Sequence, residues 1–267
     1  MDWVYDMPTW QYALIVVATS LCLACGSHVL FRRIVARDEL LRHNDVAGFI
    51  ASLVGVIYAV LLSFIVVVVW QEYDTAGGVA QKEASAVSDL YHLTYGYPQT
   101  IGEHLRTDLR RYSALMVERE WPQMQRGGQS SEAGELGHHI LGHILRLAAR
   151  TEAAAQLRSL SLTDIQSFFD ARRDRLNQNQ TSLPRILWTT LLIGGIVTVA
   201  FTFFFGMESA RFQLTMTAGL TIVIAMMFVL IVELDFPFRG DTRVAPTMWT
   251  DVSQEMARES PQNIYRP

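Results

Sequence analysis

Residues 46–70 read VAGFIASLVGVIYAVLLSFIVVVVW and contain no Asp, Glu, Lys or Arg. A helix rises about 1.5 Å per residue, so a stretch of this length crosses the hydrocarbon core of a bilayer, which is about 30 Å thick. One charge at mid-membrane costs about 2.5–3.5 kcal/mol on insertion scales, which explains why the stretch carries none. The stretch therefore predicts a transmembrane helix.

Three more stretches are equally free of charge, namely Met7–Leu30, Ile186–Met207 and Phe212–Val232. The chain has 267 residues, of which 50% are hydrophobic, and a net charge of only −4, so its charges are segregated rather than scarce. The sequence predicts an all-α membrane protein with four transmembrane helices and a helical soluble domain inserted between helices 2 and 3. The expected segments are a tail with the first transmembrane helix (1–30), a basic linker (31–45), the second helix (46–70), the soluble domain (71–183), the third helix (184–207), the fourth helix (212–232) and a C-terminal motif and tail (233–267).

The second transmembrane helix is expected to continue into the soluble domain. No Pro occurs between Trp70 and Pro98, and the apolar residues keep a helical period to about Thr94, with Gly77-Gly78 as the weak point. Three more helices are expected, over 98–120, 135–157 and 161–181, with a Gly/Ser-rich loop over 126–134. Trp121-Pro122 would end the first of them, and Ser161 with Asp164 would begin the third as a capping box.

Signatures of chemistry are scarce. The sequence has no Gly-rich phosphate loop, no Cys or Cys/His metal spacing and no GxSxG turn. His139 and His143, four residues apart, would share a helix face and could bind zinc, but no Glu lies between them as in HExxH, so a solvated face is favoured. We predict no enzyme, no cofactor, no metal and no nucleic-acid partner.

Two other patterns allow a structural and a functional interpretation. Small residues recur along one side of the second helix, at Gly48, Ser52, Gly55, Ala59 and Ser63. They favour close helix packing, which small residues permit in lipid, over the lining of a pore. At the end of the fourth helix, Glu233 and Asp235 precede a turn with Pro237, Phe238 and Gly240. These carboxylates would be solvated at the membrane edge, bind a cation, or pair with an Arg.

The chain resembles the bestrophin-like domain family, four-span membrane proteins found mostly in bacteria. The residues that carry the resemblance are Asn44, Gly48, the run Gly55–Phe64, Trp70, Glu72-Tyr73, Glu83-Ala84, Leu90-Tyr91, Glu120-Trp121-Pro122-x-Met124, Gly127, Arg172-Arg173-x-Arg175-Leu176, Leu183-Pro184, Gly194-Gly195 and Glu233-Leu234-Asp235-x-Pro237-Phe238-x-Gly240. Position 92 is His where the family pattern has Arg.

The resemblance implies a remote relation to the bestrophins, ring-shaped and usually pentameric anion channels whose second helix lines the pore. Our leading hypothesis is therefore a homo-oligomeric ion channel in the lipid bilayer that conducts inorganic ions. Its expected pore-lining residues are Ser52, Gly55, Ala59 and Ser63. Its expected hydrophobic gate consists of Ile57, Leu61 and Phe64, since apolar constrictions gate by dewetting.

Glu83 lies on the same long helix, and we predict an ion pair between it and Arg172 or Arg173. Two rival hypotheses remain open. One is a non-conducting membrane scaffold or stress-response partner, which oligomeric state would distinguish. The other is a membrane enzyme that uses Glu233, Asp235 and the pair Arg172/Arg173.

The expected location is the inner (plasma) membrane, crossed several times, but charge counts do not decide the orientation. The short loops carry five Arg, which would place the linker inside, whereas the flanks of the soluble domain carry seven basic residues. The resemblance implies a cytosolic domain.

Overall fold

The computed structural model describes residues 5, 7–35, 37–148, 150–207 and 209–258, and it contains no strand within them. The predicted all-α class is confirmed. The elements are α1 (Thr9–Ile34), α2 (Arg37–Arg42), α3 (Asn44–Leu93), η2 (Thr94–Gly96), α4 (Gln99–Leu115), η3 (Met116–Glu120), α5 (Trp121–Met124), α6 (Ser131–Leu145), α7 (Glu152–Gln180), α8 (Arg185–Phe201), η4 (Thr202–Phe204), α9 (Ala210–Asp235) and α10 (Thr247–Arg258).

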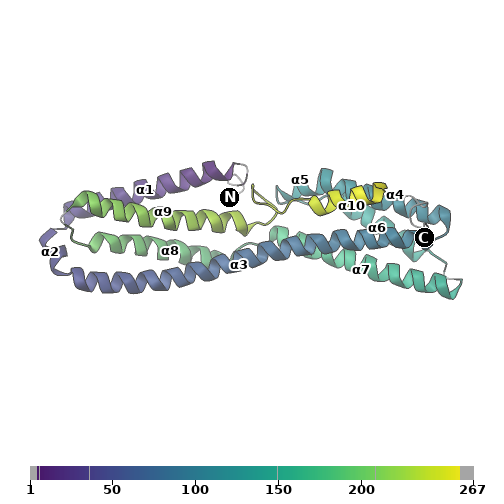
Figure 1. Ribbon diagram of the computed structural model, residues 1–267, viewed down its shortest axis with the longest axis horizontal. Helices are drawn as coiled ribbons and strands as arrows, with labels where there is room; N and C mark the ends of the chain where they lie inside the picture. Colours follow the sequence, from purple (N-terminus) through teal and green to yellow (C-terminus); the bar gives the residue numbers. More distant parts are fainter. Residues whose placement is uncertain (1–4, 6, 36, 149, 208, 259–267) are drawn as a thin grey trace. The chain divides into compact units, whose positions relative to one another are not determined.

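The chain divides into two compact units. Residues 1–72 and 182–235 form one, here called the membrane unit, and residues 73–181 and 236–267 form the other, here called the helical unit. The 50-residue helix α3 belongs to both and runs without a break through Gly77 and Gly78 (Figure 1). Neither glycine therefore interrupts the helix, although both were expected to weaken it.

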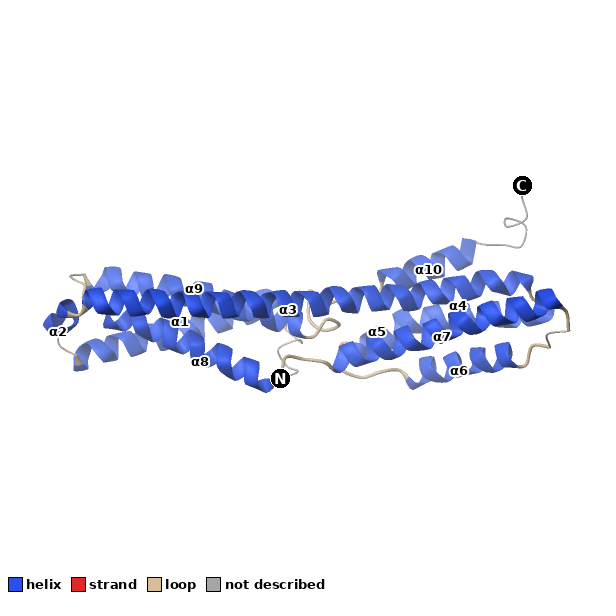
Figure 2. Ribbon diagram, turned by 90° about the horizontal axis from the view of Figure 1, so that it is seen from below, coloured by secondary structure: helices blue, strands red, loops and turns tan. Residues whose placement is uncertain are grey.

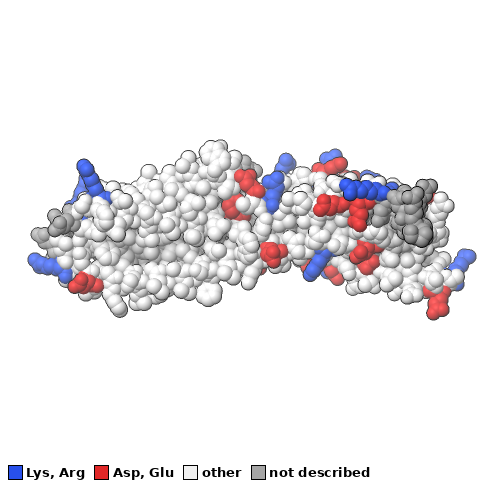
Figure 3. Space-filling view, viewed as in Figure 1, with Lys and Arg blue, Asp and Glu red and all other residues white. Residues whose placement is uncertain are grey.

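The membrane unit contains apolar helices long enough to cross a bilayer, and the described residues provide four such candidate spans. In it, α1 packs along α9, and α8 packs against α9 (Figures 1 and 2). The visible surface of this unit is uncharged over most of its length, and basic and acidic side chains appear at the end where α2 lies (Figure 3). This distribution matches the expectation from the four uncharged stretches.

Helix α3 packs against α8 through Tyr58. A methyl group added to Gly194 would lie 2.6 Å from the Tyr58 ring, and one added to Gly195 would lie 2.9 Å from the Tyr58 hydroxyl. That hydroxyl donates a hydrogen bond to the carbonyl of Leu191 at 3.1 Å. Two adjacent glycines therefore form the notch that holds α3 against α8.

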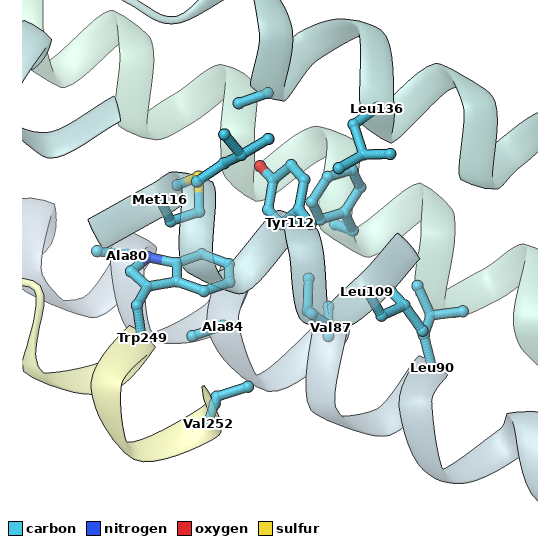
Figure 4. Close-up of a cluster of buried hydrophobic side chains, with 14 of the residues drawn as sticks. Ala80, Ala84, Val87, Leu90, Leu109, Tyr112, Met116, Leu136, Trp249 and Val252 are labelled. Carbon is cyan, nitrogen blue, oxygen red and sulfur yellow. The ribbon is translucent and has the colours of Figure 1, made fainter. Parts of the chain in front are cut away.

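The helical unit is held by an apolar core between α3, α4, α6, α7 and α10. Ala80, Ala84 and Val87 of α3 meet Tyr112 of α4 and Trp249 of α10 in this core (Figure 4). The Tyr112 ring of α4 packs edge-on against Trp249 of α10, with 5.6 Å between the ring centroids. The core fixes the α3, α4, α6 and α7 segments on which the polar clusters described below are built.

Several predicted helix boundaries differ from those in the structure. Trp121-Pro122 does not end its helix, because the chain widens into a π-helical turn at η3 and then continues as α5 with Pro122 in the first turn. Pro122 has no N–H to donate and its ring crowds the preceding turn, and the wider π-helical turn, in which the Trp121 N–H donates to the Met116 carbonyl, lies directly before it. Single π-helical turns of this kind occur within otherwise α-helical segments.

The helices around residue 150 also differ from the prediction. Helix α6 ends at Leu145 rather than near 157, and α7 begins at Glu152, where the Thr151 hydroxyl accepts a hydrogen bond from the Ala154 N–H at 3.1 Å. Ser161 is therefore interior and not a cap. It is buried and accepts a hydrogen bond from the Tyr97 hydroxyl at 2.6 Å.

Candidate functional site

The apolar half of α3 has one packed side and one exposed side. Its packed side consists of Tyr58, Leu62, Ile65 and Val69, all at most 9% exposed. At 100° per residue, these four fall within an arc of about 60°. Every exposed residue between 49 and 70 falls within the opposite arc of about 180°, which no helix of the described chain covers. This exposed arc is therefore the candidate functional surface of the membrane unit.

The predicted pore-lining residues lie along one edge of the exposed arc, with Gly55 just beyond it. Ser52, Ala59 and Ser63 are exposed, and a methyl group added to Gly55 would meet no atom within 4 Å. The Ser52 and Ser63 hydroxyls donate to the carbonyls of Phe49 and Ala59, one turn back, so neither joins α3 to another helix. Within the described residues, Ser52, Gly55 and Ser63 therefore do not join α3 to another helix, whereas Gly48 lies near the Phe205 ring.

The predicted gate residues lie at the other edge. Ile57 and Phe64 are 63% and 67% exposed, and Leu61 is half-buried just beyond them. In one continuous helix, their mean direction differs from that of the small residues by about 160°. The two sets therefore cannot face one central axis together, although the sequence analysis assigned both to the pore.

A second cluster of polar residues is buried in the helical unit, where it joins Glu83 of α3, Glu120 of η3, and Arg172 and Arg175 of α7. Arg175 Nε lies 2.5 Å from Glu83 Oε2, and Arg175 Nη2 lies 3.1 Å from Glu120 Oε1. Arg172 lies 3.7 Å from Glu83 and 3.1 Å from Glu120. With two carboxylates and two guanidinium groups, this buried tetrad is electrically neutral.

The tetrad is completed by neutral partners. The Tyr112 hydroxyl donates to Glu83 Oε1 at 2.8 Å and accepts from Arg172 Nη1 at 2.8 Å. Glu120 Oε2 accepts from the Ser130 N–H at 2.8 Å. Burial raises the pKa of Tyr112 well above its ordinary value, and the Glu83 charge raises it further, so the phenol stays protonated. Burial alone would lower the pKa of Arg175, but the charge and hydrogen bond of Glu83 outweigh it and raise that pKa.

The structure places Arg172 near Glu83, but the shortest contact is made by Arg175, which the sequence analysis did not select. Arg173 is exposed and pairs with Asp170 at 3.2 Å instead. Residues three apart share a helix face whereas neighbours do not, so Arg172 and Arg175 point together and Arg173 points away. In the sequence, the three-residue spacing of Arg172 and Arg175, among apolar residues, was the signal from which their shared direction could have been predicted.

The acidic motif at the end of α9 is buried rather than solvated. Glu233 and Asp235 are 6% and 8% exposed, and Asp235 Oδ1 accepts from the Leu183 N–H at 2.7 Å, just before α8 begins. In the helical unit, Phe238 packs edge-on against Trp121, and the Pro237 carbonyl accepts from the Val244 N–H at 2.8 Å. Gly240 has a φ of 72°, which favours glycine. These contacts give the motif a structural role at a helix end and a turn.

The enzyme hypothesis required a cavity that brings Glu233, Asp235 and the pair Arg172/Arg173 together around a substrate. Arg172 and Arg173 already have carboxylate partners inside the helical unit. The Arg172 guanidinium is also buried against Met116 and Tyr112, so it is enclosed by protein. The ion pairs of the tetrad join α3, η3 and α7.

Comparisons with known proteins agree with this architecture. The sequence matches the family described as Bestrophin-like domain over residues 18–248. None of the curated proteins matches the chain. Two crystal structures of variants of a bacterial bestrophin homologue from Klebsiella pneumoniae are similar in fold, with 11% and 12% identity and a TM-score of 0.68 each. The alignments cover 90% and 91% of this chain and 99% of each homologue.

A crystal structure described as a membrane protein variant has 13% identity and a TM-score of 0.69, with 93% of this chain and 98% of the other covered. At such low identity, these structures show a shared fold. The family match extends over most of the chain, from α1 to the first turn of α10. The chain therefore belongs to the Bestrophin-like domain family.

Proposed function

We propose that the protein is a homo-oligomeric ion channel in which the apolar half of α3 surrounds a central pore. The observation that carries the proposal is the exposed arc of α3 between Phe49 and Val68, which no helix among the described residues covers. A second copy of α3 is the partner that would cover its edges. The pentameric number and the preference for anions rest on the resemblance to bestrophins.

The geometry of a ring of α3 helices indicates which residues would line the pore. If the packed side of α3 faces its own protomer, the side 180° away faces the axis. At 100° per residue, the residues nearest that direction are Phe49, Leu53, Val56, Val60 and Val67, each at least 50% exposed. These residues replace Ser52, Gly55, Ala59 and Ser63 as the proposed lining. An apolar ring of this kind would gate by dewetting.

The two edges of the arc then face neighbouring protomers. In a cyclic ring, contacts are heterologous, so one edge of each α3 meets the opposite edge of the next. The small residues, such as Ala59 and Ser63, would receive the bulky Ile57 and Phe64 of the adjacent copy. Small residues permit close backbone approach in lipid, where dispersion contacts drive helix association. This pairing gives both predicted sets a role in assembly.

Reconstitution into liposomes tests conduction. Single-ion gradients of chloride or sodium should dissipate faster in vesicles containing the protein than in empty vesicles. Val60→Thr should raise the rate, because a hydroxyl stabilises water in an apolar constriction. Val223→Thr on α9 is the matched control, since Val223 and Val60 are 56% and 51% exposed and only Val60 would face the pore. Flux equal to that of empty vesicles for both wild type and Val60→Thr would contradict the proposal.

Assembly is tested separately by particle mass in detergent. Ala59→Phe should reduce the size of the oligomer, because the added ring occupies the edge that receives a neighbour. Ala18→Phe, at an exposed Ala of α1, should leave the size unchanged. A wild-type particle of one or two protomers would favour the non-conducting scaffold instead.

A further inference from the structure

We propose that Asp108, His139 and His143 form a binding site for one divalent transition-metal cation of the Zn²⁺ type. Asp108 lies on α4, and both histidines lie on α6. One ligand atom from each side chain can be chosen so that all three lie within 4.8 Å of one another. The site belongs to the helical unit and does not depend on the proposed channel.

The geometry is close to that of a three-ligand metal site. Asp108 Oδ2 lies 3.1 Å from His139 Nδ1, and the centroids of the His139 and His143 rings are 4.6 Å apart. Ligands at about 2.0–2.1 Å from a tetrahedral Zn²⁺ are separated by about 3.3 Å. To reach that separation, the ligand atoms must move closer together, which requires only rotation of the side chains. The side chains have room to rotate because His139 is exposed and His143 and Asp108 are half-buried.

The backbone that presents these ligands is held in register by the core. On α4, Leu105 and Leu109 flank Asp108 on the buried side, and on α6, Ile140 and Ile144 each follow one of the histidines. All four belong to the same apolar cluster. Since neither helix can slide without disrupting that cluster, the ligands are brought together before a metal binds, which lowers the entropic cost of binding.

The ligand set indicates the class of metal. Imidazole suits Zn²⁺, Cu²⁺ and Ni²⁺, whereas Ca²⁺ and Mg²⁺ prefer all-oxygen ligand sets. Two histidines and one carboxylate leave a fourth position for water, as in open zinc sites. The cation would also offset the Asp108 carboxylate and link α4 to α6, two helices that lie far apart in the sequence.

His138 provides an internal control. It is adjacent to His139 on the same helix, but its Nδ1 lies 2.8 Å from the Gly134 carbonyl and its ring packs on Phe169 at 5.1 Å. It does not belong to the three-residue group. His138→Asn and His139→Asn therefore make the same chemical change at neighbouring positions, and only the second removes a ligand.

The test is calorimetric titration of ZnCl₂ into the full-length protein in detergent, purified without a histidine tag and stripped with a chelator. We expect one Zn²⁺ per protomer in the wild type and in His138→Asn. Asp108→Asn, His139→Asn and His143→Asn should each weaken binding by about tenfold or more, at least as much as loss of an outer-shell partner does.

Co²⁺ provides a second readout, because only direct coordination by the protein produces visible d–d absorption of a four-coordinate ion. Thermal midpoints measured without metal should be similar in all variants, since the substituted groups lie at the surface or are half-buried. If one variant fails to fold, the others still carry the test. Two results would overturn the proposal: no saturable Zn²⁺ binding by the wild type, which would leave Asp108 and His139 as a surface hydrogen bond only, or equal binding by His138→Asn and His139→Asn.

Discussion

Neutralising Glu83 gives the most direct test of the buried tetrad. Glu83→Gln keeps the shape of the side chain but removes its charge, and it leaves two buried guanidinium groups with the single carboxylate of Glu120. Removing one partner of a buried ion pair costs about 3–5 kcal/mol, because the remaining charge cannot be solvated. We therefore expect a large loss of stability, although the substitution only replaces one carboxylate oxygen by an amide NH₂ group.

The assay is the thermal midpoint of the full-length protein in one detergent at one scan rate. For a chain of 150–250 residues, 1 kcal/mol shifts the midpoint by about 2–4 °C, so Glu83→Gln should lower it by about 6–20 °C. Glu132→Gln is the matched control. Glu132 pairs with Arg111 at 2.9 Å, but both side chains are about half exposed. Exposed pairs contribute about 0–1 kcal/mol, so this midpoint should move by no more than about 4 °C.

A double substitution tests the cause. Glu83→Gln combined with Arg175→Met removes one charge of each sign and leaves Glu120 paired with Arg172. It should cost less than the sum of the two single substitutions, since no net charge stays buried. Equal midpoint shifts for Glu83→Gln and Glu132→Gln, or additive costs in the double variant, would refute the reasoning.

Two further predictions concern packing and pH. Burial and the Glu83 charge raise the pKa of Tyr112 in the folded state above that in the unfolded state, which is about 10. The stability contributed by the protonated phenol is therefore present below about pH 10 and is lost as the pH rises further. Tyr112→Phe should be less stable than the wild type at pH 8 but lose less stability between pH 9 and 11; parallel losses in the two proteins would contradict this. Gly194→Ala should lower the thermal midpoint, because its methyl group would lie 2.6 Å from the Tyr58 ring and overpacking costs about 1–3 kcal/mol. Gly219→Ala on α9, where the methyl group meets nothing within 4 Å, should not lower the midpoint, and equal effects at the two positions would count against the notch.

Several local features were predictable because they depend on neighbours along the chain. The long helix through residues 71–93 follows from an unbroken apolar period without Pro. The boundaries that were missed, at Trp121-Pro122 and at Ser161, depend on a π-turn and on a cap at Thr151. A local pattern that matches a capping box can sit inside a helix when tertiary contacts, here with Tyr97, use its hydroxyl.

The four apolar helices follow from the amino-acid sequence alone, because hydrocarbon excludes charge and leaves a helix as the main way to satisfy the backbone of a single segment. The covered side of α3 became clear from the three-dimensional structure, since it depends on the notch at Gly194-Gly195, far away in the chain. The three-dimensional structure also shows that Arg175 rather than Arg173 meets Glu83, and that Asp108 lies beside His139, 31 residues away. Contacts between distant residues are set by how helices pack, and the period of one stretch shows which of its faces is buried but not which distant residue that face meets.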